Sequence, residues 1–201
     1  MNTKLILSFM GLAMFAQAQT LTTAETIGKG KSSVLLASSA LVVKDFTTLS
    51  FSFVQGVYGV HPKVDLYGGV NVTTALGQAQ TSVTGGANIN LLKSKVVSVS
   101  AFNLLTTPVN RRSDASAATW FLAAVVSRDL HVSKLGLTGY AGYSATVPLG
   151  RKLEDKLFTP PSPVYNLPVG VVIPKGKFAV FAEYNYGRTV KAASLGLAYN
   201  P

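Results

Sequence analysis

Hydrophobic and polar residues alternate one by one along most of the chain. In the run 64–73, one set of alternate positions carries Val, Leu and Gly, and the other carries Asp, Tyr, Gly, Asn and Thr. The runs 79–91 and 135–147 repeat the pattern with mainly aliphatic residues opposed to polar or small ones. A two-residue period places side chains on opposite faces of a β-strand. No helical period of comparable clarity follows residue 18, so the pattern predicts an all-β fold.

The alternating segments are separated by breaks of two kinds. Short basic turns stand at 61–63, 92–95, 129–134 and 174–177, and looser connections stand at 44–45, 76–78, 107–115, 148–164 and 187–188. The breaks predict ten strands, at 32–43, 47–60, 64–76, 79–91, 96–106, 116–128, 135–147, 165–173, 178–187 and 190–199. An even number of strands, with short turns at one end and longer loops at the other, is typical of bacterial membrane β-barrels.

The polar faces of these strands carry small uncharged residues, and the charged residues collect in the turns. Only 13% of the chain is charged, against about 25% in ordinary soluble domains. A soluble barrel would place charged side chains on its outer face. We therefore expect the apolar faces to contact lipid and the polar faces to enclose a narrow interior. Five aromatic residues near strand ends are expected at the membrane interfaces: Phe46, Tyr58, Tyr67, Phe178 and Tyr199.

The first residues have the pattern of a secretory signal peptide. A positive charge at Lys4 precedes an apolar run at 5–15 and a small-x-small motif at 16–18. The apolar run is shorter than the roughly 20 residues that a transmembrane helix needs. We predict a cleaved signal peptide at 1–18, an N-terminal periplasmic segment at 19–31 and a barrel at 32–201.

The signal peptide, the alternating strands, the turn and loop asymmetry and the closing strand 190–199 together resemble a small bacterial outer-membrane β-barrel protein. The resemblance covers residues 32–199. It implies a single antiparallel up-and-down transmembrane β-barrel of about ten strands in the cell outer membrane. It also implies outer-membrane lipids and the outer-membrane assembly machinery as partners, and it indicates no oligomeric state. The formal net charge is +10, but export and dispersed charges argue against nucleic acid as a partner.

Candidate chemistry is sparse. The chain has no cysteine, which excludes thiolate catalysis, thiolate zinc sites and disulfides. Its two histidines, His61 and His131, fall in different predicted turns at the same end of the barrel. No serine is expected to have a histidine beside it, and the two histidines are too far apart in sequence to form an obvious metal cluster. We expect no enzyme activity, no catalytic residue, no metal site and no cofactor.

Polar residues on the interior faces are the first candidate site. We expect them to line the lumen: Asp65, Asn71, Asn88, Glu183 and Asn185. The two acids either pair with Arg128, Arg188 or Lys191 across the interior or lie at water-filled ends. A second candidate comprises Arg111, Arg112, Arg151 and Lys152 in outer loops. These cations either contact lipid phosphates or anionic solutes, or are ordinary solvated loop charges.

Three functional interpretations follow. The first is a narrow channel or solute transporter, because about ten strands leave too little interior for wide, porin-like diffusion. The second is a non-transporting structural or adhesive barrel with a filled lumen. The third is a secreted soluble β-barrel or sandwich that binds a ligand. For Val70→Arg, on the expected lipid face, we predict a cost of about 2–4 kcal/mol, and a milder effect for Asn71→Arg if the lumen admits the side chain.

Overall fold

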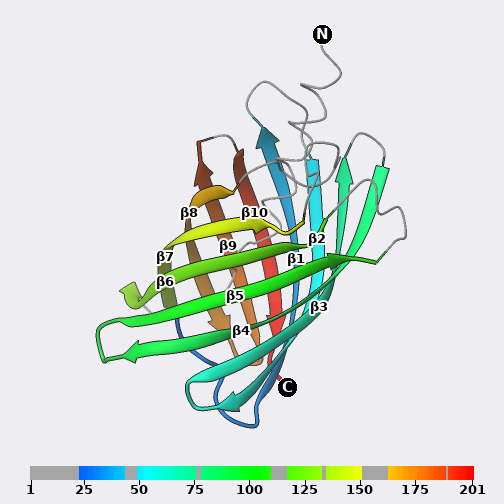
Figure 1. The fold of residues 1–201 in the computed structure, drawn as a ribbon. Helices are drawn as coiled ribbons and strands as arrows, with labels where there is room; N and C mark the ends of the chain where they lie inside the picture. Colours follow the sequence, from blue (N-terminus) through cyan, green and yellow to red (C-terminus); the bar gives the residue numbers. More distant parts are fainter. Residues whose placement is uncertain are drawn as a thin grey trace.

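Ten antiparallel strands close into one barrel in the computed structural model, which describes residues 23–43, 49–75, 78–109, 117–132, 135–150, 163–188 and 190–201. Each strand pairs with its neighbours in the chain, and β1 pairs with β10 to close the wall (Figure 1). The strands are β1 Ser32–Val43, β2 Leu49–His61, β3 Val64–Ala75, β4 Gln78–Lys93, β5 Ser98–Pro108, β6 Thr119–Val132, β7 Leu135–Pro148, β8 Val164–Lys175, β9 Phe178–Gly187 and β10 Val190–Tyr199. The predicted all-β up-and-down barrel of ten strands is confirmed.

The strand bounds follow the predicted breaks within a few residues, with two instructive extensions. Strand β4 continues to Lys93 because a register shift between Asn90 and Leu92 lets pairing with β5 resume beyond an irregular residue. Strand β6 continues to Val132, which still pairs with Leu135 of β7. The basic residues that marked these turns therefore lie partly in the strands. Hereafter the turn end is the end where β2–β3, β4–β5, β6–β7 and β8–β9 are joined, and the loop end is the opposite one.

Side-chain burial alternates along the wall as the sequence period requires. On β3, Leu66, Val70 and Val72 are exposed on the outer face, and Asp65 and Asn71 are buried inside. In the described strands, charged side chains on the outer face lie toward the strand ends. The central outer surface is therefore an uncharged aliphatic band. The described residues include no helix long and apolar enough to cross a membrane.

The interior is packed with side chains rather than lined only by small polar residues. Phe102 of β5 contacts Tyr67 edge-on, with ring centroids 5.0 Å apart, and Phe121 of β6, at 5.9 Å. Phe51 and Phe53 of β2 also point inward, and their ring centroids are 5.6 Å apart. A barrel of about this size is just wide enough for side chains to fill. Large rings on a few strands supply the volume that small residues on the others leave open.

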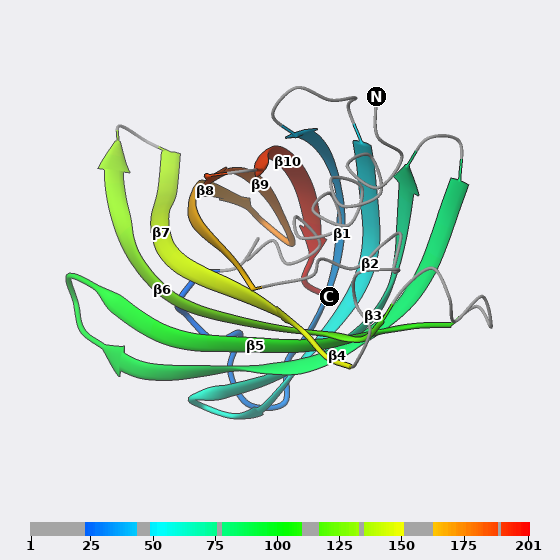
Figure 2. The same ribbon diagram turned by 45° about the horizontal axis from the view of Figure 1, so that its top comes forward.

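Strand β2 differs from the expected polarity, because its bulky apolar residues face inward and its serines face outward. Phe51 and Phe53 are buried, whereas Ser50 and Ser52 are exposed. Tyr67, expected at a membrane interface, is also buried in the interior. In both places the need to fill the interior determines the inward residue. Figure 2 shows the wall from another side, with β4, β5 and β6 strongly tilted relative to β1, β2 and β10.

Candidate functional site

The five predicted lumen residues all point into the barrel, but they do not form one site. Asp65 and Asn88 are completely buried near the turn end, and Asn71, Glu183 and Asn185 are each at most 5% exposed. Asp65 and Asn88 lie opposite each other on β3 and β4. Glu183 and Asn185 lie on β9, on the other side of the strand order. The polar interior is therefore divided into separate groups.

The first group surrounds the carboxylate of Glu183. Tyr140 of β7 donates its hydroxyl to Glu183 Oε2 at 2.9 Å, and Asn185 donates its side-chain amide to Glu183 Oε1 at 2.6 Å. Tyr140 and Glu183 are not on adjacent strands, because Gly170 of β8 lies between them in register. Both carboxylate oxygens therefore accept hydrogen bonds inside the wall.

Gly170 makes this contact possible. A Cβ atom at Gly170 would lie 2.3 Å from Cζ of Tyr140 and 2.8 Å from the carbonyl oxygen of Ala182. The missing side chain leaves a path for the Tyr140 ring across β8. Glycine within a strand often marks such a close approach. The sequence does not single out Tyr140 as a functional residue, and the glycine in β8 is the one local signal that points to it.

A second group joins β3, β4 and β5 toward the loop end. Asn71 donates its side-chain amide to Thr84 Oγ1 at 2.5 Å, and Thr84 shares a hydrogen bond of 3.1 Å with Thr106. Asn71 is 5% exposed, so it belongs to a packed network and not to a wide water-filled lumen. The condition under which Asn71→Arg was expected to be mild is therefore not met.

The third group lies at the turn end, where residues 23–31 extend across the inside of the barrel mouth. This segment is the blue coil at the bottom of Figure 1. Its backbone is held from both sides: Asn90 donates to the carbonyl oxygen of Ala24 at 2.6 Å, and Ala24 N–H donates to Ser127 Oγ at 3.2 Å. The N–H of Ile27 donates to Asp65 Oδ2 at 3.0 Å. Ala24 is completely buried, so the segment is part of the interior.

The rim of the barrel adds further contacts to the same segment. Glu25 lies 3.3 Å from the ammonium of Lys93 and accepts a hydrogen bond from Ser98 at 3.2 Å. The backbone N–H of Gly30 donates to the carbonyl oxygen of Gly59 at 2.7 Å. A Cβ atom at Gly59 would lie 2.0 Å from the carbonyl oxygen of Gly28, so only glycine fits this crossing. Residues 28–31 form a hydrogen-bonded turn, in which the N–H of Lys31 donates to the carbonyl oxygen of Gly28 at 3.2 Å, and this turn seats the segment.

The other predicted residues lie elsewhere. Arg111, Arg112, Arg151 and Lys152 lie outside the described residues. Pairing with Arg128, Arg188 or Lys191 was one of two alternatives for the interior acids, and the side chains of all three cations are exposed. Lys191, for example, lies over the ring of Tyr186 on the outer surface, 5.3 Å from its centroid.

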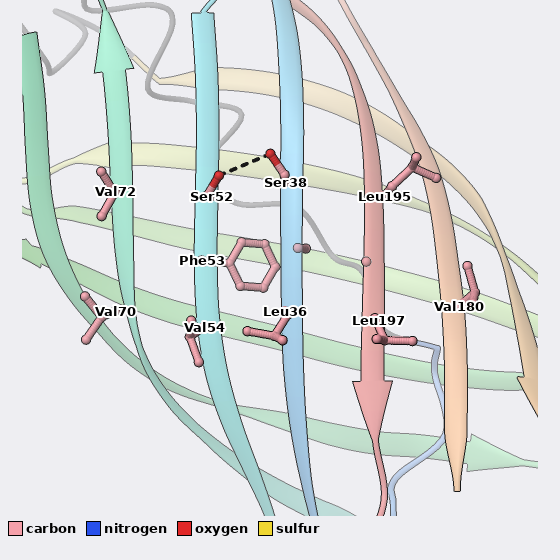
Figure 3. Close-up of a pocket in the computed structure, with 12 residues that line it drawn as sticks. Leu36, Ser38, Ser52, Phe53, Val54, Val70, Val72, Val180, Leu195 and Leu197 are labelled. Atoms are coloured by element: carbon pink, nitrogen blue, oxygen red, sulfur yellow. Dashed lines mark hydrogen bonds between the residues drawn. The ribbon is translucent and has the colours of Figure 1, made fainter. Parts of the chain in front are cut away.

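An apolar hollow of about 610 Å³ indents the outer surface where β1 meets β10. Figure 3 shows Leu36, Leu195 and Leu197 around it, with valines contributed by β2, β3 and β9. Ala37 and Gly196 are paired at this seam and border the hollow through their backbones, since both positions face the interior. At one edge Ser38 and Ser52 share a hydrogen bond of 3.1 Å, which satisfies two outward-facing hydroxyls. The hollow is therefore lined mainly by aliphatic side chains, and the two serine hydroxyls at its edge are hydrogen-bonded to each other.

Comparisons with known proteins give likenesses of fold only. No family model matches the chain, and no curated protein matches it. One solved structure, from work on the de novo design of transmembrane β-barrels, aligns over 86% of this chain and 97% of its own, with 9% identity and a TM-score of 0.44. Another, from work on the in-meso crystallization of membrane proteins, aligns over 84% of this chain and 83% of its own, with 10% identity and a TM-score of 0.37.

Proposed function

We propose that this protein spans the outer membrane of a bacterium, with lipid as its outer environment. The uncharged aliphatic band on the outer face supports this proposal, since lipid-facing positions of membrane barrels are apolar. Outward aromatic residues flank the band at both ends. Phe178 and Tyr199 pack together at the turn end, with ring centroids 5.2 Å apart, and Tyr143 and Tyr165 stack toward the loop end at 6.0 Å. The hollow at the β1–β10 seam has the chemistry of an acyl-chain site.

Within the membrane, we propose a barrel that does not transport solutes and instead serves as a structural or adhesive scaffold for its loops. The observation that carries this proposal is the filled interior. Phe51, Phe102 and Phe121 are each at most 2% exposed to solvent, and residues 23–31 occupy the turn end. A conducting pore would leave such residues in contact with water. The described interior contains hydrogen-bonded carboxylates but no histidine beside a nucleophile, and we propose no catalytic role.

A narrow channel is the second candidate, and the polar row Asn71, Thr84 and Thr106 favours it. Planar-bilayer recording with the folded protein separates the two. The scaffold proposal predicts no steady single-channel current at any voltage that the bilayer withstands. Steady, voltage-independent currents from the unmodified protein would refute it and support the channel. Folding of the protein is checked in the same sample by heat-modifiable migration on a gel, so that a lack of current is not mistaken for a lack of folded protein.

A further inference from the structure

A second hollow, of about 830 Å³, indents the outer surface next to the one at the β1–β10 seam. Most of the side chains that line it face outward from β1, β2, β8, β9 and β10. Ser38 of β1 and Leu195 of β10 line both hollows. The two hollows therefore form one continuous depression, hereafter the seam groove, on the surface that we propose to contact lipid.

The seam groove follows the outer face of β10. Ala193, Leu195 and Leu197 occupy successive outward positions of this strand, and all three line the groove (Figure 3 shows the two leucines). Ala40 of β1 and Tyr184 of β9 are the register partners of Ala193. The two alanines project less than the leucines and the tyrosine around them, which accounts for the depression at this level. The groove is therefore apolar and runs in the direction of the strand.

A lysine stands at the loop end of the seam groove. Lys191 is the next outward position of β10 beyond Ala193, and its ammonium lies 5.3 Å from the ring centroid of Tyr186, its register partner on β9. Arg188, in the connection between β9 and β10, is also exposed. In the part of the chain that the structure describes, acidic side chains occur only inside the barrel or at the turn end, at Glu25, Asp65, Asp129 and Glu183. The groove therefore ends in positive charge that the described chain does not neutralise.

The length of the seam groove fits one leaflet of a bilayer. Lys191 and Leu197 are six residues apart on β10, which is about 20 Å along a strand at about 3.3 Å per residue. The hydrocarbon core of a bilayer is about 30 Å thick, so one leaflet is about 15 Å. Because the strands of membrane barrels tilt by about 35–45°, a groove of this length descends by about 15 Å. An acyl chain whose head group lies at Lys191 can therefore follow the groove to Leu197.

Two other occupants fit the seam groove less well. A neutral apolar molecule would leave Lys191 and Arg188 without an anion. A second copy of the chain, packed here about a two-fold axis along the bilayer normal, would contribute the same patch and bring the two Lys191 side chains toward each other. Like charges so placed repel each other. An anionic lipid supplies both an apolar chain and a negative charge.

We propose that the seam groove binds one anionic phospholipid from the leaflet at the loop end. Its phosphate accepts charge-assisted hydrogen bonds from Lys191 and Arg188, and one acyl chain lies along Ala193, Leu195 and Leu197. Tyr186 holds the ammonium of Lys191 at the level of the head groups, where tyrosine is enriched in membrane proteins. The inference rests on the proposed membrane location of the barrel and does not depend on whether the barrel conducts.

The test counts lipids bound to the whole folded protein by native mass spectrometry in a non-ionic detergent. The two probes are phosphatidylglycerol, which is anionic, and phosphatidylcholine with the same acyl chains, which has no net charge. We expect one phosphatidylglycerol per chain to stay bound at a concentration at which phosphatidylcholine is lost. Equal retention of the two lipids by the unmodified protein would overturn the proposal.

Two substitutions examine the two ends of the site separately. Lys191→Gln should weaken phosphatidylglycerol binding by about fivefold, because a basic side chain near a membrane surface contributes about 1 kcal/mol to binding anionic lipid. Its control is Lys177→Gln, which removes an exposed lysine from the β8–β9 turn and should leave binding unchanged. Ala193→Leu fills the groove and should abolish the selective binding, whereas Ala124→Leu, the same exchange at an exposed position of β6, should not.

Both substitutions are on the outer surface, so folding is checked by heat-modifiable migration and not assumed. Unchanged binding in folded Lys191→Gln would refute the head-group contact, and unchanged binding in folded Ala193→Leu would refute the groove as the site. A protein that is monomeric and folded without detergent would overturn the membrane location together with this inference. A detergent-dependent, folded protein that does not distinguish the two lipids would overturn this inference alone.

Discussion

Val70 lies on the outer face of β3, near the middle of the strand, and its neighbours in register are Val54 and Val83. All three are exposed on the barrel surface, and Val70 is 46% exposed. If that surface contacts hydrocarbon, Val70→Arg places a guanidinium close to the bilayer centre. Arginine on the lipid face costs about 2–4 kcal/mol at the midplane and falls to about 0–1 kcal/mol near the interfaces. Because Val70 lies mid-strand, we predict that Val70→Arg lowers the free energy of unfolding by about 2–4 kcal/mol.

The matched control is Val96→Arg, which makes the same exchange at a 60% exposed valine in the β4–β5 turn. This position lies at the rim, so its cost should stay within about 0.5 kcal/mol. The free energy of unfolding of both variants is measured by denaturant titration of the protein folded in lipid vesicles. The fluorescence of Trp120 reports folding, since it is the one tryptophan of the chain and is partly exposed on the outer face. Equal stability of the two variants would show that the aliphatic band faces water.

Three further substitutions test the interior. Gly170→Ala should destabilise the barrel by about 1–3 kcal/mol, because the new methyl group collides with the buried ring of Tyr140. Its control is Gly68→Ala, which should change stability much less because no atom lies within 4 Å of the added Cβ. Tyr140→Phe should cost about 1–3 kcal/mol in the same unfolding assay, because it removes a donor from a buried carboxylate. Gly59→Ala should release residues 23–31 and speed their amide hydrogen exchange, whereas Gly56→Ala, with only an ordinary contact, should not. Unchanged exchange in Gly59→Ala would mean that the segment is not held by the Gly59 crossing.

The wall of the barrel could be predicted from the sequence because strand formation and facing depend on local pattern. Alternation at 64–73 was enough to place Leu66 and Val70 outside and Asp65 and Asn71 inside. The breaks gave all ten strands and the neighbour-to-neighbour topology. In an antiparallel barrel each strand pairs with the strands nearest to it in sequence, so little long-range information was needed apart from closure.

The contents of the barrel could be predicted only in part, because packing there joins residues that are distant in sequence. Residues 23–31 do not show the two-residue alternation of a strand, yet the N–H of Ala24 is hydrogen-bonded to Ser127, 103 positions away. The Tyr140–Glu183 contact depends on Gly170 standing between them in register, which the local pattern does not reveal.

The sequence by itself determined the strands, their order and the face that most side chains occupy, since a two-residue period is a property of neighbouring residues. The tertiary structure decided which interior positions are filled by aromatic rings, which polar groups meet, and that the N-terminal segment enters the mouth. Phe51 and Phe53 point inward although their strand has serines on its other face. The physical reason is volume: a closed wall must be filled to native density, and that requirement acts on the whole interior at once.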